Sequence, residues 1–331
     1  LVLIAVLSVL LGCSDDSGGD GNGGADVADA AEDTAVDGVA EDAADTTDVA
    51  EDGEETTDTD DGHDTSDTAD DAADTGENAD TSDSGTESAC GPAAPMPASE
   101  FATVHEVGPG QSYETPGEVP WESIEAGTLV RIHHRAEPYA SKWVINTDGT
   151  AQAPVVVRGI PSGGELPVIT GEDATTREAL DFWSEGRGVI KIGGSSTPST
   201  SDGPSHIYIE SLEITGGNHN NSFTDDGGSS ADYGDNAAAV YIEEGSDIVI
   251  RNCDIHTNGN GLFAAHASRD VLVTGNHIWN NGVDGSIYEH NSYTESHGIT
   301  FQYNHYGTLC DGCGGNNLKD RSSGTVVRYN W

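Results

Sequence analysis

From Phe101 onward the chain consists of short runs in which apolar and polar residues alternate, separated by Gly, Asn and Asp. Such alternation is the pattern of half-buried β-strands. No segment keeps a helical period long enough for a strand–helix–strand unit, which disfavours doubly wound and α/β-barrel folds. The pattern therefore predicts an all-β domain, with strands that include 128–132, 154–158, 189–192 and 206–214.

The later strands repeat one pattern at intervals of 23, 28 and 26 residues. Segments 248–255, 271–278, 299–306 and 325–331 align so that one position holds Cys253, Asn276, Asn304 and Asn330. A repeat of this length, with loops of variable size, is typical of a solenoid in which each coil contacts only its neighbours. We therefore expect parallel strands about 4.8 Å apart. The asparagines should hydrogen-bond along the stack, and the small, apolar Cys253 should end their row.

This coil pattern resembles that of the right-handed parallel β-helix, or pectin-lyase-like, proteins. The resemblance covers residues 101–331 at the level of fold and implies a solenoid. A β-sandwich or a propeller is the alternative, but both use hairpins between strands, and hairpin sequences are few here. Because Trp331 lies inside a strand motif, we expect the solenoid to be C-terminally incomplete.

Residues 14–100 form a segment of different composition, which cycles through Asp, Ala, Thr, Gly and Glu. It has no aromatic residue between Ser14 and Ala89. A segment of this kind cannot bury enough apolar surface to offset its ordering entropy, and its like charges extend it. We expect a disordered acidic linker that acts as a spacer.

The first residues, 1–11, are apolar apart from Ser8 and are too short to span a bilayer as a helix. They fit the apolar region of a secretory signal that is N-terminally incomplete. Leu10-Leu-Gly-Cys13 resembles the bacterial lipobox, which implies acylation of Cys13. An ordinary cleaved signal with an incidental cysteine is the alternative. The lipobox reading implies a protein of the cell envelope, lipid-anchored to the outer membrane or cell surface.

The charge of the chain limits its partners. It holds 59 acidic and 12 basic residues, a formal net charge of −47. Between Ser14 and Cys90 lie 28 of the acidic residues and no Lys or Arg, which leaves 31 acidic against 12 basic residues elsewhere. So acidic a chain repels polyphosphate, which argues against nucleic acid as a partner. We expect a monomer that meets the membrane only through its lipid anchor.

The segment 314–324 is the strongest candidate for a functional site. On a strand, Lys319 and Arg321 project from the same face because they are two residues apart. Two cations suit an acidic polysaccharide, since they neutralise uronate carboxylates and hydrogen-bond sugar hydroxyls. In β-elimination these cations would stabilise charge, and a lysine such as Lys319 could supply the base. The alternative is a basic pair balanced by Asp320, with no function.

This segment resembles the Asn-Lys-Ser-Ser motif of the chondroitinase B and alginate lyase family of β-helix lyases. With the Ser-Ser pairs matched, Arg321 falls where that family has its catalytic lysine, and Asn316 falls near a calcium-binding glutamate. Both are departures, because a permanently charged Arg is a poor base and an amide is a weak calcium ligand. The resemblance implies possible calcium binding, for which Asn316 and Glu289 are the candidate ligands. Asn317 is a candidate substrate contact.

Histidines are the second chemical feature, and they lie beside acidic residues in a long insertion between Ile278 and Ile299 and in the coils around it. Such a loop can form a cleft wall and supply an acid or base. We assign His297 to catalysis and His290 and His305 to substrate contacts, the alternative being solvated loop side chains. Cys310 and Cys313 are expected to form a short disulfide, as in other exported chains.

The sequence thus predicts an anchored β-helix protein that binds acidic polysaccharide and cleaves it by β-elimination. A non-catalytic carbohydrate-binding or adhesin solenoid is the first alternative. A β-helix glycoside hydrolase is the second, but hydrolysis needs two carboxylates facing each other across a groove. The adjacent pair Asp225 and Asp226 falls in the Gly/Ser/Asn-rich segment 218–235 rather than on a strand.

Overall fold

The computed structural model describes residues 95–194 and 203–331. In these, every strand except β10 (Ser230–Asp232) pairs with a strand of a neighbouring coil. The pairings between named strands are parallel, except that of β9 (Ser222–Thr224) with β10. The predicted signal with Cys13, and residues 14–94 of the predicted linker, lie outside the described residues. The described part is therefore a parallel β-solenoid, as the 23-to-28-residue repeat predicted.

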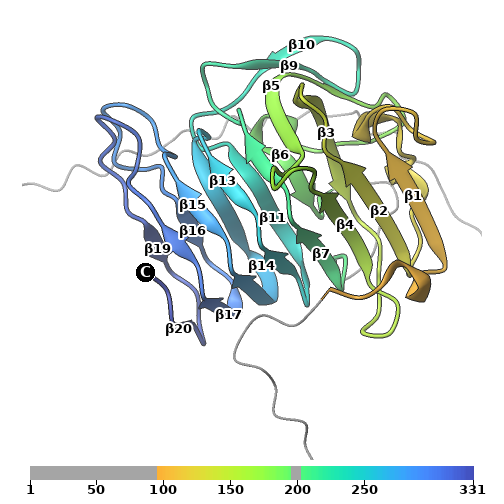
Figure 1. The fold of residues 1–331 in the computed structure, drawn as a ribbon. Coiled ribbons are helices and arrows are strands. Elements are labelled where there is room, and N and C mark those ends of the chain that lie inside the picture. Colours follow the sequence, from red (N-terminus) through yellow and green to blue (C-terminus); the bar gives the residue numbers. More distant parts are fainter. Residues whose placement is uncertain (1–94, 195–202) are drawn as a thin grey trace, which may run out of the picture. The chain divides into compact units, whose positions relative to one another are not determined.

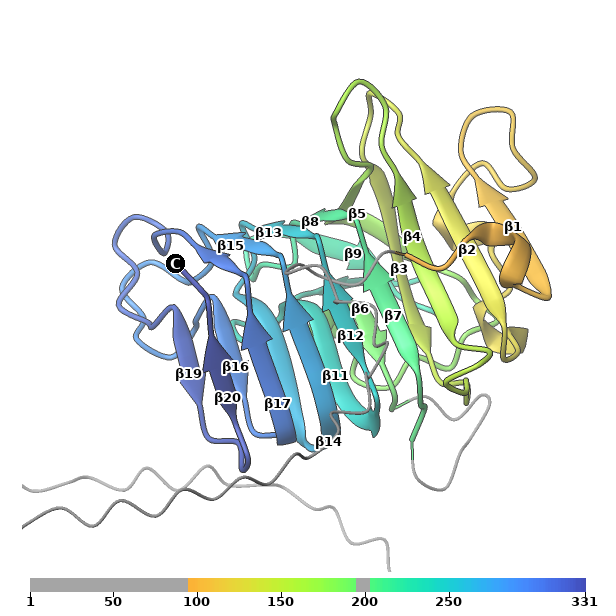
Figure 2. The same ribbon diagram turned by 60° about the horizontal axis from the view of Figure 1, so that its bottom comes forward.

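The strands form three faces that run along the stack of coils (Figures 1 and 2). The first face consists of β3 (Tyr139–Ile145), β6 (Gly188–Ile192), β11 (Ala238–Ser246), β14 (Asn260–Thr274), β16 (Ser292–Thr294) and β19 (Leu318–Asp320). The second face consists of β1 (Thr103–Val107), β2 (Thr128–His133), β4 (Val155–Ile160), β7 (Ile207–Glu210), β12 (Val249–Arg251), the C-terminal half of β14, β17 (His297–Gln302) and β20 (Val326–Arg328). The third face consists of the start of β3, β5 (Val168–Thr176), β8 (Glu213–Thr215), β13 (Asp254–His256), β15 (His277–Trp279) and β18 (His305–Tyr306).

The chain bends between the second and third faces at one residue of left-handed backbone conformation. The residues at this bend are Ser211, Asn252, Gly275, Tyr303 and Tyr329, with φ between 54° and 68°. The bend divides the predicted strand 206–214 into β7 and β8, so the prediction of one continuous strand was wrong. Since Ser211, Tyr303 and Tyr329 have side chains that disfavour positive φ, tertiary pairing and not local preference fixes the bend at these coils.

The interior of the solenoid is filled by columns of side chains that repeat at each coil. On the second face Ile209, Ile250, Val273 and Phe301 stand at matching positions, and all four are fully buried. Each buried side chain of this size contributes about 1.5–3 kcal/mol relative to an exposed one. The column also restricts register, because a slip of one residue would turn every one of these side chains outward.

A ladder of asparagines follows the bend, as predicted. The Asn276 side chain donates to Asn304 Oδ1 at 3.0 Å, and Asn304 donates in turn to Asn330 Oδ1 at 2.9 Å. The row ends at Cys253, whose backbone N–H donates to Asn276 Oδ1. Cys253 is buried and fills the position of an asparagine with a small apolar group, which confirms the predicted end of the ladder.

A second asparagine ladder was not predicted from the sequence. Here Asn258 donates to Asn281 Oδ1, Asn281 to Asn291 Oδ1 and Asn291 to Asn317 Oδ1, at 2.8–3.0 Å. These residues follow one another at intervals of 23, 10 and 26 positions. The short middle interval breaks the repeat, so the alignment of coils does not reveal this row.

Helices are few. Those among the described residues are 3₁₀ turns at Ala98–Glu100, Pro116–Glu118, Trp121–Ser123 and Glu185–Arg187. No described helix has the length and apolar composition needed to cross a membrane. In the segment predicted as linker, Met96 packs with Leu129 and Val156 on the second face, and its carbonyl accepts a hydrogen bond from Arg158.

The antiparallel pair β9 and β10 is a hairpin in a segment expected to be an irregular loop. Its turn is closed by Asp225, whose Oδ1 accepts the Ser229 N–H at 2.6 Å. Asp226 Oδ2 accepts the Phe182 N–H at 3.0 Å, so both carboxylates of this pair are used in local structure.

A buried lysine joins this hairpin to the turn that precedes β6. Lys142 Nζ lies 3.8 Å from the ring centroid of Phe223 and 4.3 Å from that of Tyr233. It donates to the carbonyls of Glu185 and Gly188 at 2.8 and 2.7 Å. Lys142 thereby holds the 3₁₀ turn Glu185–Arg187 against the first face. Burial, with Glu185 opposing and Lys191 adding to its effect, lowers the pKa of Lys142 to about 7.

Replacement of Asn304 by alanine should destabilise the solenoid. It would leave the buried N–H of Asn276 and C=O of Val273 without partners, at about 1–3 kcal/mol each. We expect a loss of about 2–5 kcal/mol in the free energy of unfolding, measured by denaturant titration. Asn220→Ala, at an exposed position, should change it by less than about 0.5 kcal/mol. Equal effects of the two substitutions would show that the ladder does not stabilise the fold.

Lys142→Met should remove a pH-dependent part of the stability. Between the lowered pKa of about 7 in the folded protein and the ordinary value of 10.5, only the unfolded chain holds the Lys142 proton. The free energy of unfolding therefore rises with pH in this window, by up to about 1.4 kcal/mol per pH unit. We expect the stability of the wild type relative to the variant to increase from about pH 7 to about pH 9. A constant difference would mean that Lys142 does not change its protonation on unfolding.

Candidate functional site

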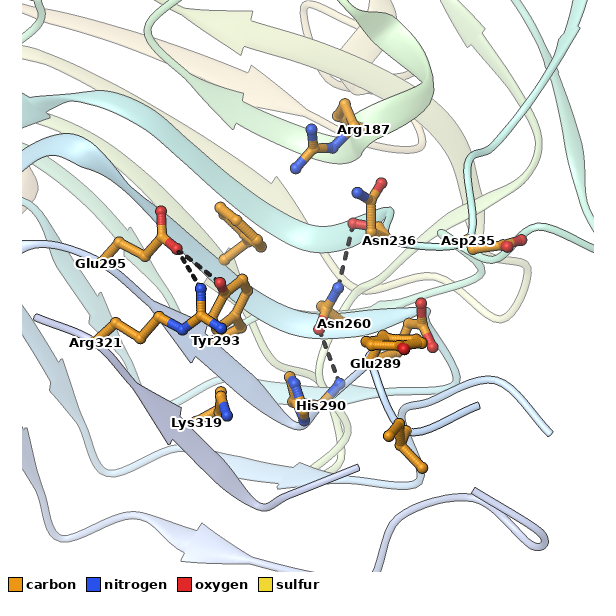
Figure 3. Close-up of a pocket in the computed structure, with 13 residues that line it drawn as sticks. Arg187, Asp235, Asn236, Asn260, Glu289, His290, Tyr293, Glu295, Lys319 and Arg321 are labelled. Carbon is orange, nitrogen blue, oxygen red and sulfur yellow. Dashed lines mark hydrogen bonds and ion pairs between the residues drawn. The ribbon is translucent and has the colours of Figure 1, made fainter. Parts of the chain in front are cut away.

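A pocket of about 560 Å³ lies on the outer side of the first face, where β14, β16 and β19 are adjacent (Figure 3). It brings together four residues predicted from the sequence, Glu289, His290, Lys319 and Arg321. The other lining residues are Arg187, Asp235, Asn236, Asn260, Phe263, Ile287, Tyr288, Tyr293 and Glu295. Eight of the thirteen lining residues come from the predicted insertion between Ile278 and Ile299 and from the 314–324 segment.

A column of aromatic rings runs along the first face, and two of them, Phe263 and Tyr293, line this pocket. Tyr241, Phe263 and Tyr293 occupy matching positions on β11, β14 and β16, and Lys319 takes the next position on β19. The ring centroids are 5.2 Å apart for Tyr241 and Phe263 and 4.8 Å apart for Phe263 and Tyr293, in edge-to-face contact. These residues point outward because they alternate with core residues such as Leu262.

Lys319 and Arg321 are neighbours on this wall, as their spacing predicted. Lys319 is half-buried in β19, and Arg321 follows directly after the strand and is exposed. The Arg321 guanidinium carbon lies 5.6 Å from the Tyr293 ring centroid and its Nη1 lies 3.7 Å from Glu295 Oε1. Lys319 makes no ion pair with a described residue, so its charge is available to a ligand.

The phenol of Tyr293 holds its proton firmly. Its hydroxyl donates to Glu295 Oε1 at 2.7 Å. Burial raises the pKa of Tyr293, the Glu295 carboxylate raises it further, and Arg321 opposes the change. Tyr293 is therefore a protonated donor near neutral pH.

His290 lies at the centre of the pocket and is neutral. Its side chain is 4% exposed, and burial, followed by the charges of Lys319 and Arg321, lowers its pKa to about 4. The ring Nδ1 accepts the backbone N–H of Asn316 at 2.9 Å, so the proton of the neutral ring is assigned to Nε2. His290 is thus a hydrogen-bond donor rather than a cation at neutral pH.

Carboxylates lie on the other side of His290. Figure 3 shows Lys319, Arg321 and Glu295 to the left of His290, and Asp235 and Glu289 to its right. Glu289 is 5% exposed, and its buried Oε2 has no hydrogen-bond partner among the described residues. Asn260, one rung earlier, accepts the backbone N–H of His290 at 2.8 Å and fixes this part of the wall.

Arg187 is a pocket residue that the sequence analysis missed. It ends the 3₁₀ turn before β6, far from Lys319 in sequence, and the coil register brings it to the same face. Its guanidinium carbon is 4.8 Å from the Tyr241 ring centroid and 5.2 Å from that of Phe263. Its buried Nε has no partner among the described residues. No local motif marks this arginine, so only a knowledge of register could have found it.

The remaining predicted site residues lie outside the pocket. His297, exposed on the second face, pairs with the Ser323 hydroxyl through Nδ1 at 2.9 Å. His305 stacks on His277 and Trp331 on the third face, with centroids 4.7 and 5.7 Å away. Asn317 ends the second asparagine ladder, and Asn316 reaches His290 through its backbone.

The two cysteines of the predicted short bridge, Cys310 and Cys313, are joined by a disulfide. This loop lies against Gly282, in the insertion that forms the pocket wall. In residues 95–194 and 203–331, no group of three or more His, Cys, Asp or Glu side chains is placed to hold a metal ion. Calcium binding by Asn316 and Glu289 therefore stays a prediction.

The family described as the right handed beta helix region matches residues 180–328. The fold is a right-handed parallel β-helix. No curated protein sequence matches the chain. Among solved structures, an alginate lyase from Paenibacillus sp. str. FPU-7 is similar over 63% of this chain and 61% of its own, with 12% identity and a TM-score of 0.44.

Two further solved structures are similar to the β-helix. A rhamnogalacturonan lyase has 13% identity and a TM-score of 0.35, over 69% of this chain and 62% of its own. The ORF18 protein of Geobacillus virus E2 has 15% identity and a TM-score of 0.34, over 61% of this chain and 40% of its own. The chain thus spans less than two thirds of each neighbour.

Lys319→Met should raise the pKa of His290 above its value of about 4. The lysine charge is one of the causes that lower it, while burial and Arg321 would keep it below the ordinary 6.5. The pKa can be measured by following the imidazole resonances in an NMR titration. Arg328→Met, which removes an exposed cation on the second face, should leave it unchanged. An unshifted His290 in the Lys319 variant would contradict the geometry described here.

Proposed function

We propose that the protein binds acidic polysaccharide in this pocket and cleaves it by β-elimination. The observation on which the proposal rests is the pair of cations, Lys319 and Arg321, beside the neutral donor His290 and the protonated Tyr293. The rim adds a surface for sugar rings, because Tyr288 is 76% exposed.

The roles of the side chains follow from the reaction. A base removes the C5 proton of the uronate, the C4–O bond breaks, a double bond forms between C4 and C5, and the leaving oxygen takes up a proton. Arg321 would neutralise the carboxylate and so acidify C5, and the Nε2–H of His290 would donate to the enolate that develops. Tyr293 would give its proton to the leaving oxygen, and Lys319 is the candidate for the base.

Calcium would assist the same step by adding positive charge to the uronate carboxylate. The candidate ligands remain Glu289, whose Oε2 has no partner, and Asn316, whose side chain is exposed. Activity measured with added calcium and again with EDTA decides whether the ion takes part.

The setting of this activity is also part of the proposal. Acylation of Cys13 would anchor the protein to the outer membrane or cell surface, and the acidic segment 14–100 would hold the β-helix away from it. In this setting the protein would act as a monomer on extracellular polysaccharide.

A non-catalytic carbohydrate-binding or adhesin function is the second candidate. It is favoured by the state of two pocket groups that could otherwise act as a base, since the Nδ1 of His290 is already bonded and Tyr293 keeps its proton. A hydrolase remains the third, because Asp235, Glu289 and Glu295 all line the pocket and two of them could act as an acid and a nucleophile or base.

Lys319→Ala and Arg321→Ala should each lower turnover of alginate, chondroitin or pectate by about 10²–10³-fold, because the first removes the candidate base and the second removes charge stabilisation of the transition state. The measurement is the ultraviolet absorbance of unsaturated uronate ends, with circular dichroism to verify folding. Arg328→Ala removes a cation from the second face and should have no effect.

The same assay separates the three candidates. Binding of polysaccharide without any product would favour the scaffold. New reducing ends without the absorbance would favour hydrolysis. Unchanged rates in both pocket variants would remove Lys319 and Arg321 from the site.

A further inference from the structure

The carboxylates of the pocket have a different environment from its cations. Glu295 is paired with Arg321, but Asp235 and Glu289 make no ion pair with a described residue. They lie on the side of His290 opposite Lys319 and Arg321 (Figure 3). The pocket therefore has a basic side, formed by Lys319 and Arg321, and an acidic side, formed by Asp235 and Glu289.

Glu289 is the residue on the acidic side whose carboxylate is buried and lacks a partner. It lines the pocket, only 5% of its surface is exposed, and its Oε2 lacks a hydrogen-bond partner among the described residues. A buried carboxylate oxygen without a partner is costly, and proteins usually satisfy it with a donor or a cation. The neighbouring amide of Asn260 does not meet this need, because its Nδ2 already donates to the Asn236 carbonyl at 3.2 Å. The missing partner is therefore expected to come from a ligand.

A positively charged organic group fits this position better than a metal ion. Calcium takes six to eight oxygen ligands in its protein sites. In the described part of the chain, no group of three or more His, Cys, Asp or Glu side chains is placed to hold a metal ion. An ammonium group, in contrast, has three hydrogens to donate and needs only one or two carboxylates with a hydroxyl or carbonyl beside them.

We propose that the pocket takes a glycan of mixed charge, with an acidic sugar held by Lys319 and Arg321 and an amino sugar with a free amine held by Glu289 and Asp235. The binding of the acidic sugar by Lys319 and Arg321 rests on the proposed function. The charge of the chain supports a ligand of mixed charge, since the chain outside the segment 14–90 has 31 acidic and 12 basic residues. A domain of this charge repels a uniform polyanion, whereas a glycan that alternates acid and amine is nearly neutral.

The test compares three hexasaccharides by calorimetry at neutral pH. The first is a chondroitin oligosaccharide, in which uronate alternates with N-acetylated amino sugar. The second is the same oligosaccharide after removal of the acetyl groups, and the third is an oligogalacturonate. A charge-assisted hydrogen bond of about 1.5–3 kcal/mol corresponds to about 10- to 100-fold in affinity. We expect the de-N-acetylated form to bind tighter than its parent by this factor.

Variants assign the preference to the acidic side of the pocket. Glu289→Gln, which keeps the shape and removes the charge, should abolish the preference for the free amine while the N-acetylated form still binds. Glu172→Gln, at an exposed position of β5, should leave the preference for the free amine unchanged.

Each other outcome has a definite meaning. Equal affinity of the wild type for the two chondroitin forms, or a preference that survives in Glu289→Gln, would overturn the inference and leave the proposed function standing. Tighter binding of oligogalacturonate that EDTA abolishes would overturn it in favour of a bridging divalent cation. Failure of all three oligosaccharides to bind would overturn the proposed function as well.

Discussion

Parallel backbone pairing between coils is the constraint on which the pocket depends. Each coil lies about 4.8 Å above the last, so residues at one position of successive coils become vertical neighbours whatever their distance in sequence. This places the rings of Tyr241, Phe263 and Tyr293 in one column and Lys319 at the next position. It also brings Arg187 to the same wall. A slip of one residue in any coil would turn its member of this column toward the core.

Two kinds of interaction hold that register. The inward columns of Ile and Val stabilise the coils but tolerate small displacements, since apolar contacts have little directionality. The asparagine ladders are directional. The Asn304 Oδ1, for example, accepts from both the backbone N–H and the side-chain amide of Asn276 in the preceding coil. The second ladder ends at Asn317, immediately before β19, and therefore helps to position Lys319. Lys142 does the same for Arg187 by bonding to the turn that carries it.

The repeat of Asn276, Asn304 and Asn330 made the fold predictable, because the same side chain recurs wherever the same hydrogen bond is needed. The position of Lys319 and Arg321 on the same face was also predictable, because residues two apart on a strand project from the same side. Arg187 was not, since its contact depends on the register of coils without a recognisable repeat. His297 was assigned to the site from its nearness in sequence, but it follows the chain onto the second face. Loops that cross from one face to another thus limit what sequence proximity can predict.

The arrangement of charge in the pocket follows from the charge of the whole chain. Three cations and three carboxylates line it, so the pocket offers no net attraction to set against a formal charge of −47. Recognition must then come from where the charges lie. Burial, with the charges of Lys319 and Arg321 adding to its effect, lowers the pKa of His290 to about 4, which keeps a neutral donor between the two sides of the pocket. A protonated His290 would extend the basic side toward Glu289 and pair with it. The neutral ring instead leaves the Glu289 carboxylate available to a ligand. Burial and the two cations thus together keep His290 from neutralising the acidic side of the pocket.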